Sequence, residues 1–124
     1  MYDDLARGDI EAILAGLHPQ VEWHEAEGNP YQPDGIPFRG PEEVLQKLFA
    51  RLGQDWTSFV VTPRAFHECS DGVVVVEARY TGTFSGTGRE LDCQVCHILT
   101  YEDSKLRKFQ QYVDTAQLRT VMGA

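Results

Sequence analysis

The last strand-like stretch of the chain, FQQYVDTAQLRT at residues 109–120, carries an acidic residue with the chemistry needed for proton transfer. Successive side chains of a strand alternate between its two faces, so Gln110, Tyr112 and Asp114 share one face. Two interpretations of Asp114 are open. Its carboxylate is an acid/base group that faces a cavity, with Gln110 and Tyr112 on the same wall, or it caps a last helix that begins near Thr115.

His97 is the second candidate, on the strand-like run before the last one. A dry cavity raises the pKa of a carboxylate, and a neighbouring imidazole can donate a hydrogen bond to a developing enolate oxygen. The turn EDSK joins the two runs, so hairpin pairing can bring His97 and Asp114 close together. The pair is typical of proton transfer next to a carbonyl. The alternative for His97 is a hydrogen-bonded core histidine.

The motif CQVCH, which contains Cys93 and Cys96, matches the pattern for covalent haem attachment. Residues 90–101 are rich in strand-forming residues, however, and positions three apart on a strand face opposite sides. The two thiols then cannot converge on one haem or one metal. His67 and Cys69 share a face, but two ligands alone do not make a metal site. We therefore expect no cofactor and no metal.

Length and charge limit the class of protein. The 124 residues fit one domain, residues 1–124, and no apolar run approaches the roughly 20 residues of a membrane span. The net charge of -8, from 11 basic and 19 acidic residues, argues against nucleic-acid binding. Without a signal segment, and with three cysteines expected as free thiols, the sequence predicts a soluble cytoplasmic protein that is not associated with a membrane.

Hydrophobic periodicity indicates helices before strands. We expect two short helices within 5–17, separated at Gly8 and Asp9, a strand at 21–25, a long loop at 27–41, a helix over 41–52, and four strands within 58–69, 72–86, 89–102 and 105–114. Helices followed by a run of antiparallel strands indicate an α+β domain with helices on one face of a curved sheet.

At this point the sequence resembles a known family. The segments LARGDIEAILAGLHPQVEWHEAEGNPY, FRGPEEVLQKLF, VVVVEARYTGTFSGTGREL and CQVCHILTYEDSKLRKFQQYVDT, in this order, are similar to the SnoaL-like, ketosteroid-isomerase-like branch of the nuclear-transport-factor-2-like superfamily. The resemblance implies a cone: a strongly curved, mostly antiparallel sheet wrapped around three N-terminal helices, enclosing a pocket. It also implies a homodimer formed through the outer face of the sheet.

The resemblance places the histidine and the closing aspartate of the family, here His97 and Asp114, in the pocket as catalytic residues. Trp23 is then expected as a flat wall near the pocket mouth, with core packing as the alternative. Tyr31, on the long loop, is expected to close over a ligand, with an exposed turn tyrosine as the alternative. For His24 and Glu25 we expect a solvated strand edge.

Two functions follow from these expectations. The first is an isomerase- or cyclase-like enzyme that transfers protons on a small hydrophobic carbonyl compound without a cofactor. The second is a binding module of the same fold that holds a small hydrophobic ligand without turnover. The classical isomerases of the family use a tyrosine and a second acid as an oxyanion site, and this sequence offers no assignable pair, which favours the binding module.

Overall fold

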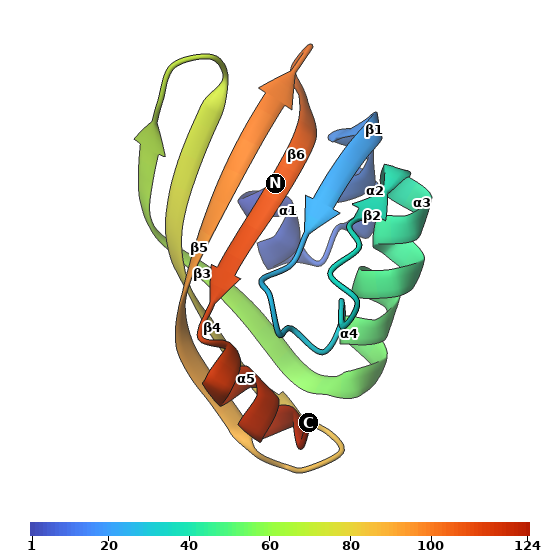
Figure 1. Ribbon diagram of the computed structural model, residues 1–124, viewed down its shortest axis with the longest axis vertical. Coiled ribbons are helices and arrows are strands. Elements are labelled where there is room, and N and C mark those ends of the chain that lie inside the picture. The colour runs from blue at the N-terminus through green and yellow to red at the C-terminus, as the bar shows by residue number, and fades with distance from the viewer.

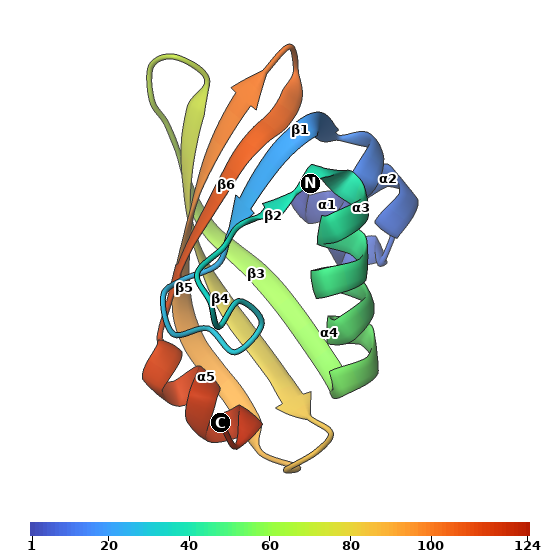
Figure 2. The same ribbon diagram turned by 45° about the vertical axis from the view of Figure 1, so that its right-hand side comes forward.

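A six-stranded, strongly bent sheet forms the frame of the molecule, and helices cover its concave side (Figure 1 and Figure 2). The computed structural model describes the chain from Met1 to Ala124. Its elements are α1 (Tyr2–Arg7), α2 (Ile10–Ala15), β1 (Leu17–His24), β2 (Phe38–Arg39), α3 (Gly40–Val44), η1 (Leu45–Phe49), α4 (Ala50–Asp55), β3 (Trp56–Glu68), β4 (Val73–Phe84), β5 (Glu90–Glu102), β6 (Lys105–Val113) and α5 (Thr115–Met122). The predicted α+β fold, a curved and mostly antiparallel sheet around N-terminal helices, is confirmed.

The strands lie in the order β2-β1-β6-β5-β4-β3. The four strands from β3 to β6 pair antiparallel, as the alternating runs and short turns predicted. β1 joins this meander by parallel pairing with β6, so the sheet is mixed. Parallel neighbours need a long connection, and here most of the chain separates the two strands. The sequence pattern predicted β1 as a strand but could not identify its partner.

Alternation along β5 and β6 decides which side chains reach the concave face. On β5 the buried residues are every second one: Leu91, Cys93, Val95, His97 and Leu99. In the register of the sheet His97 lies opposite Gln111, and Leu99 lies opposite Phe109. Gln111 and Phe109 are accordingly buried. The inward side chains of β6 are therefore Phe109 and Gln111, with Gln110 and Tyr112 directed outward.

The first two helices are short because α1 ends and α2 begins within two residues, Gly8 and Asp9. Gly8 ends α1 in the left-handed conformation, with φ of 67°, which glycine adopts without steric cost. Asp9 then caps α2, since its Oδ1 accepts a hydrogen bond from Ala12 N at 3.1 Å. The predicted break at Gly8 and Asp9 is confirmed.

The third predicted helix is formed by α3, η1 and α4, and it contains a π-helical turn. Pro41 and the acidic first turn start it, as predicted. It continues past Leu52, the predicted end, to Asp55. No helix in the structure is both long enough and apolar enough to cross a membrane.

Candidate functional site

An inner cavity of about 560 Å³ lies between the concave face of the sheet and the helices. Its wall includes residues of α1, the end of β1, the third helix, the first half of β3, and inward side chains of β4, β5 and β6. Sixteen of its 24 lining residues are hydrophobic, and none is lysine or arginine. These features suit a small, mostly apolar molecule without negative charge.

Glu25 is the one acidic residue on this wall, and its carboxyl group is buried. Its Oε1 is 3.4 Å from Trp23 Nε1, a long hydrogen bond, and its Oε2 has no hydrogen-bond partner in the protein. Burial raises the pKa of Glu25 from 4.5 to about 7, and the contact with the Trp23 indole opposes only part of that increase. The group can therefore take up and release a proton near neutral pH, as an acid/base catalyst must.

The side chain of Gln32 holds Glu25 in place at the end of β1. Gln32 is buried; it accepts a hydrogen bond from the Glu25 backbone N at 3.1 Å and donates one to the Trp23 carbonyl at 3.0 Å. Pairing of β1 with β6 extends only to His24, so this amide continues the hydrogen bonding that the strand no longer supplies. The loop after β1 is thereby fixed against the cavity.

Gln111 links this loop to the sheet. Its Oε1 accepts hydrogen bonds from Ala26 N at 3.2 Å and from Asn29 Nδ2 at 2.9 Å. Its Nε2 donates to Tyr80 Oη at 3.0 Å. Because two donors converge on one side of the carboxamide, the oxygen must lie there and the NH₂ group must face Tyr80. Gln111 and Tyr80 both lie on the cavity wall.

The hydrogen bonds of Tyr80 decide the tautomer of His97. Tyr80 Oη is 2.6 Å from His97 Nε2, and Tyr2 Oη is 2.8 Å from His97 Nδ1. Tyr80 is buried, so leaving its O–H without an acceptor would cost about 1–3 kcal/mol. Tyr80 therefore donates to Nε2, and the Nδ1–H of His97 donates to the half-buried Tyr2.

His97 lies on the wall of the inner cavity, but both of its ring nitrogens are hydrogen bonded within the protein. Burial lowers the pKa of His97 from 6.5 to about 3, so the imidazole is neutral at neutral pH. Proton transfer by this ring would first require one of the two bonds to break. Of the two interpretations in the sequence analysis, the geometry favours the hydrogen-bonded core histidine.

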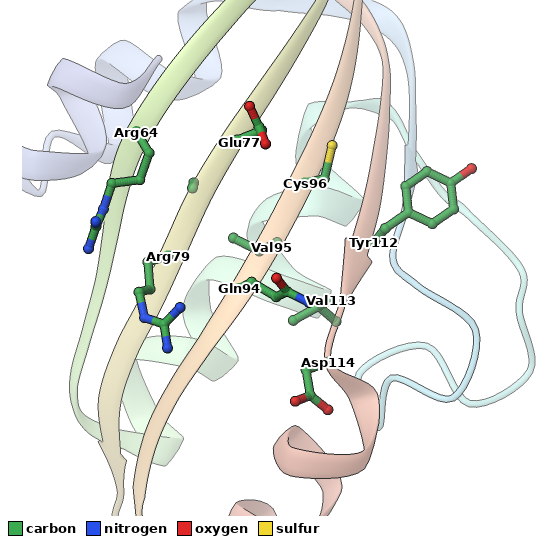
Figure 3. A pocket seen from close by; sticks show the side chains of 10 residues that line it. Arg64, Glu77, Arg79, Gln94, Val95, Cys96, Tyr112, Val113 and Asp114 are labelled. Carbon is green, nitrogen blue, oxygen red and sulfur yellow. The ribbon is translucent and has the colours of Figure 1, made fainter.

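Asp114 lies on the other face of the sheet, beside an open outer groove of about 660 Å³ (Figure 3). Its Oδ1 accepts a hydrogen bond from Gln117 N at 3.0 Å and caps α5. The expectation that Asp114 and His97 face one cavity is wrong, because β6 directs Gln111 inward opposite His97 and Asp114 belongs to the outward set. The capping interpretation is confirmed.

Gln110 and Tyr112 share the outward face with Asp114, as strand alternation predicted, but this face is not the cavity wall. Tyr112 is 55 % exposed and lines the outer groove. Gln110 donates a hydrogen bond from Nε2 to the neighbouring Gln111 carbonyl at 3.0 Å. Their expected place beside a ligand in the cavity is therefore corrected to the outer surface.

Trp23 and Tyr31 both lie on the wall of the inner cavity. Trp23 stacks on Phe109 with 3.8 Å between ring centroids. Tyr31 is buried, accepts a hydrogen bond from Trp56 Nε1 at 3.0 Å and donates one to Asp55 Oδ2 at 2.8 Å. The alternative of an exposed turn tyrosine is excluded, and contact of either residue with a ligand stays a prediction.

Glu25 is the candidate acid/base residue that sequence reasoning missed. The solvated strand edge expected for it is wrong, because it is only 7 % exposed. Strand alternation in VEWHE places Glu25 on the same face as Val21 and Trp23, and both of these are buried. That signal was present in the sequence. Its neighbour His24 faces the other way and lies 3.7 Å from the carboxylate of Glu22.

The outer groove is a depression of mixed polarity, with five hydrophobic residues among the ten that line it, and these residues come from four strands and the start of α5 (Figure 3). Arg79 Nε pairs with Asp92 Oδ1 at 2.6 Å at its side. Cys96 lines the groove, whereas Cys93 is buried in the core on the opposite face. The two thiols of CQVCH therefore point to opposite sides of β5, as predicted, and cannot hold one haem together.

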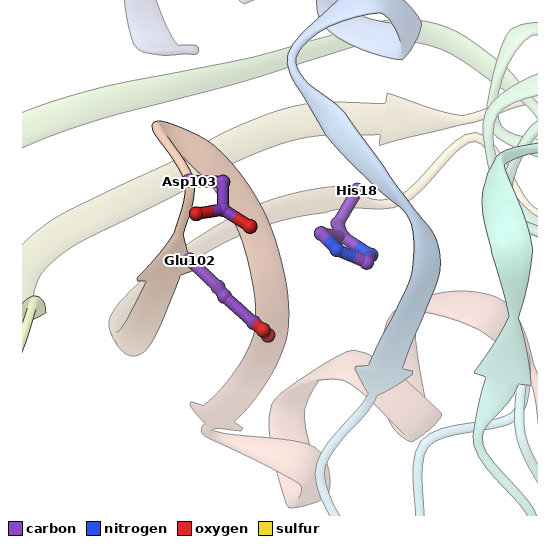
Figure 4. Close-up of side chains that lie close together, drawn as sticks. All are labelled: His18, Glu102 and Asp103. Carbon is purple, nitrogen blue, oxygen red and sulfur yellow. The ribbon is translucent and has the colours of Figure 1, made fainter.

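A second set of potential metal ligands lies at the tip of the β5–β6 hairpin. Ligand atoms of His18, Glu102 and Asp103 lie within 4.8 Å of one another (Figure 4). The Nδ1 of His18 accepts a hydrogen bond from Gln20 N at 3.0 Å, and Arg107 Nε lies 3.4 Å from Glu102. Both acidic residues are exposed, and Glu102 already has a cationic neighbour in Arg107, so the arrangement alone does not indicate a metal site.

Replacing Asp114 separates capping from catalysis. Asparagine caps a helix about as well as aspartate, so Asp114→Asn is expected to leave the melting temperature unchanged, while Asp114→Ala lowers the free energy of unfolding by about 1 kcal/mol. Neither change should alter ligand affinity, because the side chain is not on the wall of the inner cavity. Thermal unfolding and ligand titration measure both effects. Loss of ligand binding in a folded Asp114→Asn protein would contradict this placement.

Comparison with known proteins agrees with this architecture. The profile of the SnoaL-like domain family matches residues 1–109. An NTF2-like protein of Burkholderia thailandensis is 30% identical, with a TM-score of 0.90 over 98% of this chain and 90% of that one. TerC, solved with polyporic acid, is 27% identical, with a TM-score of 0.84 over 99% and 92% of the two chains.

A proposed SnoaL-like polyketide cyclase from Jannaschia shares the fold at 18% identity, with a TM-score of 0.78 over 94% of this chain and 80% of that one. A comparison with curated protein sequences finds no significant match.

Proposed function

The chain belongs to the SnoaL-like domain family, and from this premise we propose that its inner cavity binds a small, mostly apolar carbonyl compound and transfers a proton on it, as isomerases and cyclases do. The observation that carries the proposal is Glu25. It is a buried carboxyl group on the cavity wall, it has an oxygen without a protein partner, and its pKa is about 7. Structural carboxylates are usually paired, so this one is a functional candidate.

The cavity wall supports an uncharged substrate. No lysine or arginine lies on it, so a phosphate or carboxylate would find no cationic side chain of these types there. The aromatic rings of Trp23, Phe49 and Phe59 offer flat apolar surface to a ligand. TerC, which is 27% identical, was crystallised with polyporic acid, and this supports a small organic ligand in the same fold.

In the proposed reaction, Glu25 acts first as a base. Its carboxylate takes the proton from the carbon next to the carbonyl, and the electron pair of the broken C–H bond moves into an enolate. The protonated Glu25 then returns the proton to another carbon in an isomerisation. In a cyclisation the enolate carbon attacks a second carbonyl of the same molecule, and the proton goes to the resulting oxygen. Neither reaction consumes a cofactor.

Binding without turnover is the second candidate. The observation that favours it is that His97, Tyr31 and Tyr80 are all hydrogen bonded within the protein. Glu25 is then the one ionisable group on the wall with an unused atom, and a two-step proton transfer must rely on it alone. Under this proposal the cavity holds the apolar ligand, and Glu25 serves as a hydrogen-bonding group.

Deuterium exchange separates the two candidates. The protein is incubated in D₂O with a panel of small enolisable ketones, and exchange at the carbon next to the carbonyl is followed by proton NMR. Proton transfer predicts exchange above the buffer rate for at least one ketone, inhibited by a bound competitor. Ketones that bind the cavity, as shown by ligand-observed NMR, but exchange at the buffer rate would exclude the enzyme and leave the binding module.

We also propose that the protein is a homodimer formed through the outer face of the sheet. Val75 and Ile98 lie side by side on this face, and the large side chain of Tyr112, which lies opposite Cys96 on the same face, is 55 % exposed. Light scattering at micromolar concentration is expected to give twice the chain mass of 14.0 kDa.

Tyr112→Glu is expected to shift this dimer to monomer, whereas Ile36→Glu, at an exposed apolar residue away from the sheet, should not. A monomer mass for the unmodified protein would refute the dimer.

A further inference from the structure

We propose that the carboxamide of Gln111 is a catalytic group of the inner cavity, where the free N–H of Nε2 donates a hydrogen bond to the enolate oxygen. This inference rests on the proposed function and assigns to Gln111 the stabilisation of the enolate, which Glu25 does not provide. When Glu25 has taken the proton, the negative charge lies on the ligand oxygen, and a donor must stabilise it.

Besides Gln111, the wall has two side-chain donors with an unused hydrogen, the second N–H of Asn29 Nδ2 and the hydroxyl of the exposed Ser58, whereas its indoles and phenols are in use. The indole of Trp23 donates to Glu25, and the indole of Trp56 donates to Tyr31. The two wall phenols donate to partners in the protein, Tyr31 to Asp55 and Tyr80 to His97. An NH₂ group has two hydrogens, and only one of those on Gln111 Nε2 is used, by Tyr80 Oη.

The orientation of the Gln111 carboxamide is fixed before any ligand binds. Ala26 N and Asn29 Nδ2 both donate to its Oε1, so a flipped amide would place NH₂ against two other donors. Gln111 is 5 % exposed, and Asn29 is itself held by a hydrogen bond from Tyr31 N to its Oδ1 at 2.9 Å. A donor that is held in position pays no reorganisation cost during the reaction, which is what an oxyanion site requires. Asn29 is in this sense a positioning residue.

A neutral amide also suits the charge of this cavity. Burial raises the pKa of Tyr80 well above 10, so its proton stays on the phenol, where it is committed to His97. A cationic donor would lower the pKa of Glu25 and so make it a weaker base. An amide stabilises the enolate but carries no positive charge that would lower this pKa. In this proposal the cavity therefore combines one base, Glu25, with one uncharged donor, Gln111.

The test uses equilibrium binding, so that it does not depend on turnover. The Glu25→Gln protein mimics the state in which Glu25 has accepted the proton. In this background 4-nitrophenolate, an anionic oxygen on a flat apolar ring, is compared with the neutral 4-nitroanisole, and the two dissociation constants are measured by titration. Adding Gln111→Met is expected to weaken phenolate binding about 10- to 100-fold, the usual value of a hydrogen bond to a charged group, and to leave 4-nitroanisole unchanged.

Gln110→Met in the same background provides the matched control, because it makes the same substitution at the neighbouring residue, which is not on the cavity wall. The preference for phenolate is expected to persist in it. Loss of that preference in Gln110→Met, or its persistence in Gln111→Met, would overturn the proposal. If Gln111→Met does not fold, Gln111→Glu, which keeps the accepting oxygen and lacks the N–H, is measured in its place. Failure of both probes to bind the Glu25→Gln protein would count against the cavity function itself, and with it against the role of Gln111.

Discussion

Replacing Glu25 with glutamine is expected to lower the rate of deuterium exchange into a bound ketone by about 10²- to 10⁴-fold, the usual contribution of a general base. Glutamine has nearly the same shape and keeps a hydrogen-bonding oxygen, but it cannot accept the proton. Ketone affinity should change little, because the apolar wall that supplies most of the binding is unchanged. The effect is therefore expected in the rate at saturating ketone.

Glu27→Gln is the matched control, because Glu27 lies two residues away and is exposed. It is expected to exchange deuterium like the unmodified protein, as is Asp114→Asn, whose side chain lies on the outer groove. Full exchange activity in Glu25→Gln together with loss of activity in Asp114→Asn would restore the closing aspartate as the base and refute the assignment to Glu25.

The two carboxylates show where sequence reasoning on this fold succeeds and where it fails. Alternation correctly groups Gln110, Tyr112 and Asp114 on one face of β6. It does not say which face of a strand is inward, and the apolar side chain of Phe109 on the other face was the better indicator. The register with β5 then places Gln111 opposite His97, and pairing of this kind is a property of the folded sheet.

The contacts of His97 could not be predicted for a related reason. Its position on an inward strand face follows from the pattern of β5, but its partners Tyr2 and Tyr80 come from α1 and β4. Tyr2 is 95 positions away along the chain, and no periodicity relates the two residues. These partners turn an apparent catalytic histidine into a neutral hydrogen-bonding link, since both ring nitrogens are used and burial lowers its pKa.

Glu25 and His97 also predict how stability depends on pH. The pKa of Glu25 is about 7 in the folded protein and 4.5 ordinarily, so between these values the folded state binds more protons and loses stability as pH rises. The pKa of His97 is about 3 when folded and 6.5 ordinarily, so between these values the folded state binds fewer protons and gains stability as pH rises. From pH 4.5 to 6.5 the two effects oppose each other.

The Glu25→Gln substitution removes the contribution of Glu25 to this pH dependence and leaves that of His97. Its free energy of unfolding is expected to rise from pH 4.5 to 6.5 under the influence of His97, while that of the unmodified protein stays nearly flat. The difference in free energy of unfolding between the two proteins should grow from near zero below pH 4.5 to about 3 kcal/mol above pH 7, with the variant more stable. This is the free energy that corresponds to raising the pKa of Glu25 from 4.5 to about 7 on folding.

Urea unfolding at a series of pH values, with Glu27→Gln as control, measures this difference. If the curves of Glu25→Gln and the unmodified protein run parallel between pH 4 and pH 8, Glu25 is not a buried proton-accepting group, and both its place on the cavity wall and its role as the base are wrong.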